Sequence, residues 1–221
     1  LSILGGAPQK LVDNVWGPSV SPDGSLIAFS RYDPELGNWD LWLVNSNGEG
    51  PRKFRHSSHP NEHNGFPAWS PNGKRLFYIR IFDNNNGHSI ESCDLGGKDV
   101  TTMFSTTAEV QGLCGAPEGK LFFSMGEPSG MNLWEIRVDV ATGLPLTEAR
   151  RLTQLSGFSW MEANTLSVTA DAKRLVLLRG TGQADIYVAE AEASGKSIKN
   201  TRRLTLNETD DRVCDWTADS R

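Results

Sequence analysis

The sequence predicts an all-β protein of the β-propeller class, and three observations support this. Ser21-Pro22-Asp23-Gly24 lies between two apolar runs, and its proline and glycine favour a tight β-hairpin. Related turns return at intervals of 46 to 53 residues, a period typical of propeller arrays. No segment shows a sustained helical period. The related turns are Ser70–Gly73, Ala116–Gly119, Thr169–Ala172 and Thr217–Ser220.

Each repeat supplies four strands, two of them flanking the turn. In the first whole repeat we expect strands over 15–20, 25–32, 38–45 and 51–55. The third of these is apolar on both faces, with Trp39, Leu41 and Leu43 alternating with Trp42 and Val44. A strand of this kind is expected where a sheet is covered on both sides.

The remaining repeats follow the same order. Four-stranded antiparallel blades are expected over 15–55, 64–105, 110–153 and 163–206, with part-blades over 1–14 and 210–221. One four-stranded sheet cannot cover its own faces, whereas sheets packed radially bury both. We therefore expect a partial ring from a parent of six to eight blades. The alternative is an incomplete five-membered ring, in which the leading strands pair beside the trailing one.

Composition narrows the class of partner. The chain has 221 residues, a formal net charge of −5 and 38% hydrophobic residues. The dispersed charge argues against a nucleic-acid partner, and no apolar run is long enough to span a membrane. Cys93, Cys114 and Cys214 are far apart and odd in number, which favours buried thiols over disulfides or a metal site. No cofactor or metal is predicted.

The repeat resembles that of TolB-type propellers. Its elements are the Ser-Pro-Asp-Gly turn, Asp-Leu-Trp at Asp40–Trp42 or Asp-Ile-Tyr at Asp185–Tyr187, and Arg-Leu-Thr at Arg151–Thr153 and Arg203–Thr205. The glycine-free last turns also resemble propellers appended to bacterial serine/threonine kinases and winged-helix regulators. These resemblances imply an accessory sensor or interaction module. The TolB resemblance favours a periplasmic location, whereas the kinase-type resemblance allows an extracytoplasmic or a cytoplasmic one.

Longer loops indicate which rim of the ring binds ligands. The connections between second and third strands, and between successive repeats, lie on one rim and include 31–37, 56–65 and 154–163. Two long loops on the opposite rim, 141–147 and 193–200, weaken this assignment. The binding-rim candidates are Arg31, Tyr32, Asp33, His56, His59, Glu62, His63, Phe158, Trp160 and Glu162.

Two of these loops have alternative interpretations. The three histidines and Glu62 within 56–63 could hold zinc, but Pro60 and the polar residues around it favour a solvated loop. Asp83–Gly87 has oxygen ligands suited to calcium, yet its spacing fits a hairpin turn better. Phe158 and Trp160 either plug the space over the next blade or form an exposed patch for a partner. The other tryptophans are interpreted mostly as packing between blades.

No catalytic motif is visible. Gly157–Met161 fails the G-x-S-x-G pattern at its last position, and no phosphate-binding or kinase signature is present. The first hypothesis is a non-catalytic domain that binds a protein or small ligand within a larger bacterial signalling protein. The second is the substrate-gating propeller of a prolyl-oligopeptidase-type peptidase whose catalytic domain lies outside this chain. A propeller enzyme acting on carbohydrate is a third, but the inner strands offer no paired carboxylates.

Overall fold

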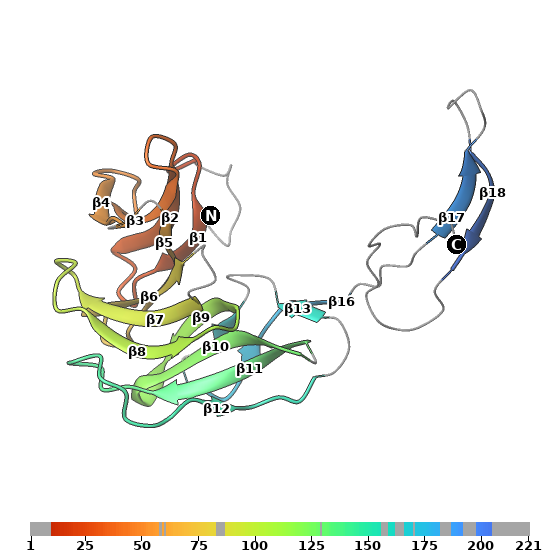
Figure 1. Ribbon diagram of the computed structural model, residues 1–221. Coiled ribbons are helices and arrows are strands. Elements are labelled where there is room, and N and C mark those ends of the chain that lie inside the picture. The colour runs from red at the N-terminus through yellow and green to blue at the C-terminus, as the bar shows by residue number, and fades with distance from the viewer. Residues whose placement is uncertain are drawn as a thin grey trace, which may run out of the picture.

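The computed structural model describes residues 10–57, 59, 61–82, 87–128, 130–155, 159–161, 166–169, 171–181, 187–191 and 198–204. Within these residues the protein consists of β-strands and one short 3₁₀ turn, Pro117–Gly119 (Figure 1). None of the described residues form a helix long and apolar enough to cross a membrane. The predicted all-β class is confirmed.

Three four-stranded antiparallel sheets make up most of the described fold, each with its strands in chain order. Sheet 1 consists of β1 (Trp16–Val20), β2 (Leu26–Asp33), β3 (Asn38–Asn45) and β4 (Arg52–Arg55). Sheet 2 consists of β5 (Glu62–Trp69), β6 (Arg75–Phe82), β7 (Gly87–Asp94) and β8 (Thr101–Thr106). Sheet 3 consists of β9 (Val110–Ala116), β10 (Lys120–Glu127), β11 (Gly130–Arg137) and β12 (Arg150–Arg151).

The repeated turn forms the hairpin between the first two strands, as predicted. In sheet 1 the Ser21 amide donates to the Leu26 carbonyl and the Gly24 amide to the Ser21 carbonyl, both at 2.8 Å. The Asp23 carboxylate accepts hydrogen bonds from the Ser21 hydroxyl (2.6 Å) and from the Ser25 amide and hydroxyl. These bonds lower the pKa of Asp23 to about 2, because they favour the charged form.

The third repeat shortens this turn by one residue. Lys120 pairs directly with Ala116, so only three residues connect β9 and β10. The second strands of sheets 2 and 3 keep equivalent positions despite the shorter turn. Leu121 occupies the position of Leu76, although it follows the start of its turn by one residue fewer. Met125 therefore occupies the position of Arg80, because Met125 lies four residues after Leu121 and Arg80 lies four residues after Leu76.

Two apolar clusters join the three four-stranded sheets, and a third joins sheet 3 to the short strands that follow it. One lies between sheets 1 and 2 and includes Ala28, Leu41, Leu43, Trp69 and Leu76. The other lies between sheets 2 and 3 and is larger; its members include Phe77, Ile79, Ile90, Val110, Leu113, Leu121, Phe123 and Met125. Both clusters form because alternate side chains of each strand face opposite sides of its sheet.

The inner strands β5 and β9 approach each other closely at a glycine. A Cβ atom on Gly115 would lie 2.1 Å from the Trp69 carbonyl oxygen. No side chain fits there, so Gly115 lets sheet 3 pack against the inner strand of sheet 2.

Beyond sheet 3 the described strands are short. β13 (Ser159–Met161) pairs with β16 (Arg179–Thr181), β14 (Ser167–Val168) with β15 (Leu175–Val176), and β17 (Tyr187–Ala191) with β18 (Ile198–Arg203). The described residues therefore contain two-stranded sheets where a fourth four-stranded blade was expected. The fourth turn does form, with the Thr169 amide donating to the Arg174 carbonyl. Its glycine is replaced by Ala172, which has a strained φ of 55°.

Three local expectations can be compared with the structure. The loop expected over 56–65 ends earlier, because β5 begins at Glu62 and pairs with β6 from there. β6 and β7 form the expected hairpin, with Phe82 paired to Gly87, although residues 83–86 lie outside the described part. Cys93 is buried and Cys114 partly buried, both as free thiols, while Cys214 lies outside the described residues.

Candidate functional site

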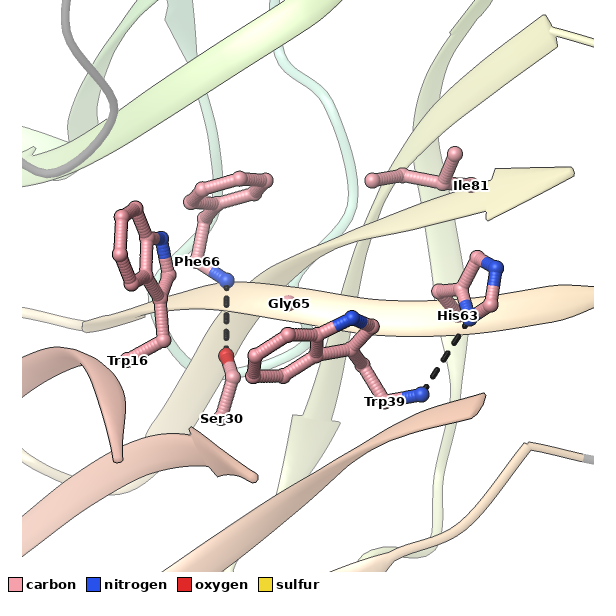
Figure 2. Close-up of a pocket in the computed structure, with 7 residues that line it drawn as sticks. All are labelled: Trp16, Ser30, Trp39, His63, Gly65, Phe66 and Ile81. Atoms are coloured by element: carbon pink, nitrogen blue, oxygen red, sulfur yellow. Dashed lines mark hydrogen bonds between the residues drawn. The ribbon is translucent and has the colours of Figure 1, made fainter. Parts of the chain in front are cut away.

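An aromatic pocket of about 470 Å³ lies where the inner strand of sheet 2 meets sheet 1 (Figure 2). Its lining is mostly apolar, and it draws on β1, β2, β3, β5 and β6. We call this site the aromatic pocket; its lining residues are Trp16, Ser30, Trp39, His63, Gly65, Phe66 and Ile81.

Two hydrogen bonds fix the walls of the aromatic pocket. The Trp39 amide donates to Nδ1 of His63 at 3.2 Å, so this ring nitrogen carries no proton. The Phe66 amide donates to the Ser30 hydroxyl at 3.2 Å. Phe66 lies at an irregularity in the pairing of β5 with β6 and has a φ of 55°. This bulge gives Phe66 its place on the pocket wall, as Figure 2 shows.

Large aromatic surfaces at the pocket remain exposed. Trp16 is 51% exposed, although it is one of the largest apolar side chains in the chain. Tyr32 is 48% exposed, and its ring centroid lies 5.5 Å from that of Trp39. Among the described residues, no arginine, lysine, aspartate or glutamate lines the pocket. The arrangement is suited to an apolar or aromatic group, for which rigid aromatic walls provide contact area at low entropic cost.

A charged cluster lies beside the pocket on sheet 2. The Arg80 guanidinium contacts Glu62 at 3.0 Å and Glu91 at 3.3 Å, and both carboxylates are almost completely buried. The Tyr78 hydroxyl donates to Glu91 at 2.7 Å. Burial and the bond to Glu91 raise the pKa of Tyr78. Burial acts to lower the pKa of Arg80, but its pairing with Glu62 and Glu91 outweighs this and raises it.

A second charged cluster lies on sheet 1. Lys53 contacts Asp40 at 2.7 Å and Asp33 at 3.0 Å, and the Arg31 guanidinium lies 5.2 Å from the centre of the Trp42 ring. The hydrogen bond from Lys53 lowers the pKa of Asp33, and the bond to Asp40 raises that of Lys53. These contacts give Arg31 and Asp33 partners within sheet 1.

The rim candidates thus fall in different places. His63 lines the aromatic pocket and Tyr32 flanks it, whereas Glu62 is buried against Arg80. Glu62 was expected in a loop; it lies in β5, where pairing with Phe82 and the contact with Arg80 hold it. His56 and His59 are exposed in the segment before β5. Phe158, Glu162 and the Trp160 side chain lie outside the described part of the chain.

Metal ligands do not converge in the part of the chain that the structure describes. No group of three or more histidine, cysteine or acidic side chains within it is placed to hold an ion. In the 56–63 segment the Glu62 carboxylate instead contacts Arg80, and Nδ1 of His63 accepts the Trp39 amide.

Sequence reasoning missed most of the pocket walls. Trp16 and Trp39 were interpreted as packing residues, and Phe66 and Ile81 as ordinary strand positions. The only available signal was the number of tryptophans at the same end of the first repeat, close to the rim loops. The other walls of the pocket depend on the bulge at Phe66 and on the packing of sheet 1 against sheet 2. A pattern of apolar residues along one strand predicts neither feature.

Comparisons with known proteins define the fold. Neither the protein-family models nor the curated proteins gave a match. Among solved structures, a TolB structure from Agrobacterium tumefaciens matches with a TM-score of 0.59 and 22% identity, covering 86% of this chain and 64% of that one. TolB from Acinetobacter baumannii matches with a TM-score of 0.57 and 18% identity, covering 89% and 45%. Prolyl oligopeptidase B from Galerina marginata matches with a TM-score of 0.50 and 14% identity, covering 85% and 26%.

These similarities establish the class: the chain consists of β-propeller blades. The propeller is TolB-like, as the Ser-Pro-Asp-Gly repeats predicted. This chain spans less than two thirds of the length of either TolB structure. At these identities the likeness concerns the fold.

Proposed function

We propose that this chain is a non-catalytic propeller domain that binds a partner protein, taking an apolar or aromatic side chain of the partner into the aromatic pocket. One observation carries the proposal: Trp16, Trp39 and Phe66 surround a pocket of about 470 Å³ whose described lining residues include no arginine, lysine, aspartate or glutamate. Interfaces concentrate their energy in such anchors, where an aromatic group is desolvated in a preformed pocket.

The position of the pocket supports a peptide or protein ligand. Trp39 and His63 each lie one residue after the start of their strand, β3 and β5, so the pocket is close to the turn 34–37, one of the connections proposed for binding. Tyr32 and Leu36 are both about half exposed at this rim and extend the apolar surface beyond the pocket. A protein segment could therefore contact the rim while one of its side chains fills the pocket.

Selection of short peptides from a displayed library tests the proposal. Peptides that bind the chain should share an apolar or aromatic anchor. Trp16→Ala should weaken their binding at least about tenfold, because truncating a central aromatic anchor typically costs about 2 kcal/mol. Val20→Ala is the matched control, since it removes an exposed apolar side chain at the other end of β1, outside the pocket and its rim. Equal binding to wild type and Trp16→Ala would rule out the pocket as the site.

The gating propeller of a serine peptidase is the alternative. The likeness to prolyl oligopeptidase B concerns the fold, so it supports this function no more than it supports protein binding. The predicted context within a bacterial signalling protein likewise stays a prediction. Sequence beyond the two ends would separate the two: a nucleophile elbow after residue 221 favours the peptidase.

A further inference from the structure

A second, polar pocket lies on sheet 2, about 380 Å³ in volume. We call it the polar pocket; it is lined by Arg80, Phe82, His88, Ser89, Glu91, Thr102, Ser105, Thr106 and Thr107. These residues come from β6, β7, β8 and the residue that follows β8. The pocket differs from the aromatic one although β6 contributes to both, because Ile81 alternates with Arg80 and Phe82 along the strand.

The lining of the polar pocket combines hydroxyl groups with a balanced charge pair. Five of its nine lining residues are serine or threonine. Arg80 and Glu91 supply one positive and one negative charge, and they contact each other at 3.3 Å. Nδ1 of His88 lies 3.0 Å from the Val110 amide nitrogen and 3.2 Å from the Val110 carbonyl oxygen, so the backbone of Val110 occupies this ring nitrogen. Arg80 also contacts the buried Glu62 at 3.0 Å, so two carboxylates already share its positive charge.

Buried polar groups anchor the floor. Glu91 is 2% exposed and accepts hydrogen bonds from the Tyr78 hydroxyl (2.7 Å) and the Ser89 hydroxyl (3.3 Å). The Arg80 guanidinium lies 4.5 Å from the centre of the Phe82 ring, which holds its plane. Nε of Arg80 is buried without a hydrogen-bond partner. Arg80 thus retains donor capacity beyond its two carboxylate contacts.

We infer that the polar pocket binds a neutral polyhydroxylated ligand of the size of a sugar ring. Serine and threonine hydroxyls both donate and accept, which matches the hydroxyl groups of a sugar. Glu91 adds an acceptor and Arg80 a donor. An anionic ligand would lack a free counter-ion among the described lining residues, because Glu62 and Glu91 already pair with Arg80. This site is separate from the aromatic pocket and does not depend on the function proposed for it.

Saturation-transfer difference NMR tests the inference on the 221-residue chain. The probes are glucose, galactose, mannose and N-acetylglucosamine, each at millimolar concentration, with glucuronate as the charged counterpart. At least one neutral sugar should receive saturation. In spectra of the ¹⁵N-labelled chain, the same sugar should shift the amides of Thr102, Ser105, Thr106 and Thr107. No signal from any neutral sugar, or a response to glucuronate alone, would overturn the inference.

Two substitutions at Ser105 locate the site. Ser105 is exposed on β8, so Ser105→Trp should fill the pocket without disturbing the core and should abolish the sugar signal. Ser105→Ala removes one hydroxyl and should weaken binding about two- to tenfold. Ser46→Trp is the matched control, an exposed serine in the β3–β4 turn, and should bind like wild type. Undiminished binding to Ser105→Trp would place the sugar elsewhere and refute the site.

Discussion

The interface between sheets 1 and 2 and the interface between sheets 2 and 3 have different side chains at equivalent positions. Between sheets 1 and 2, the apolar cluster gives way to Glu62, Arg80 and Glu91, and both pockets lie next to these residues. Between sheets 2 and 3 the apolar cluster continues, with Met125 in the place that Arg80 occupies one sheet earlier. The same blade architecture therefore yields a continuous core in one case and a charged cluster beside two pockets in the other.

The comparison shows how a repeat fold separates stability from function. Phe123 is completely buried and packs near Phe104 and Trp134, with ring centroids 5.3 and 6.5 Å apart. Such packing joins two sheets and offers no surface to a ligand. The charged interface contributes less hydrophobic burial, but its polar groups create concave surface of defined chemistry.

Truncating the apolar interface should have the largest effect. Phe123→Ala leaves a cavity between sheets 2 and 3 and is expected to cost about 4 kcal/mol of unfolding free energy. Urea denaturation followed by tryptophan fluorescence measures it. A cost below about 0.5 kcal/mol would show that this interface does not hold the sheets together, since surface substitutions usually stay within that range.

Making the charged interface resemble the apolar one should cost somewhat less. Arg80→Met strands the buried carboxylates of Glu62 and Glu91, and we expect a loss of about 3 kcal/mol, reduced by the partial exposure of Arg80. The triple variant with Glu62→Gln and Glu91→Gln should regain part of this loss, because no buried charge is left unpaired. If the triple variant is less stable than Arg80→Met alone, stranded charge is not the cause. The measurement is again urea denaturation.

A smaller change in stability is expected from the hairpin turns, which occupy equivalent positions in successive repeats. Ala172 has a φ of 55° where the first two repeats have Gly24 and Gly73 at φ 73° and 68°. Ala172→Gly should therefore stabilise the chain by about 1 kcal/mol, since a left-handed residue with a Cβ is strained by that amount. Gly73→Ala is the reciprocal control and should destabilise. A destabilising Ala172→Gly would mean that the fourth turn does not require this geometry.

The smallest effect is expected from pH at the first turn. The pKa of Asp23 is lowered to about 2 by its serine hydrogen bonds, from an ordinary value of 3.8. Its contribution to stability is therefore fully present above about pH 4 and is lost as the pH falls toward 2. An NMR titration of the carboxylate should show the low pKa, and Ser21→Ala should raise it. An unchanged pKa in Ser21→Ala would exclude the Ser21 hydroxyl as its main cause.

The sequence by itself determined the architecture. Proline and glycine at the repeated turns, the period between them and the alternation of apolar residues specify hairpins and sheets that need neighbours on both faces. These are local properties of the sequence, and they recur in each repeat. That redundancy is why the TolB-like propeller could be predicted without a structure.

Only the tertiary structure decided where the candidate sites lie. Three features depend on the register between strands: the bulge that places Phe66 on the pocket wall, the burial of Glu62 against Arg80, and the one-residue offset that gives Met125 the position equivalent to Arg80. The two pockets further require residues from several strands to converge, and the aromatic pocket requires two sheets to meet. Strand patterns encode which residues alternate, but contacts across strands and sheets depend on how far each chain segment is displaced along its neighbour.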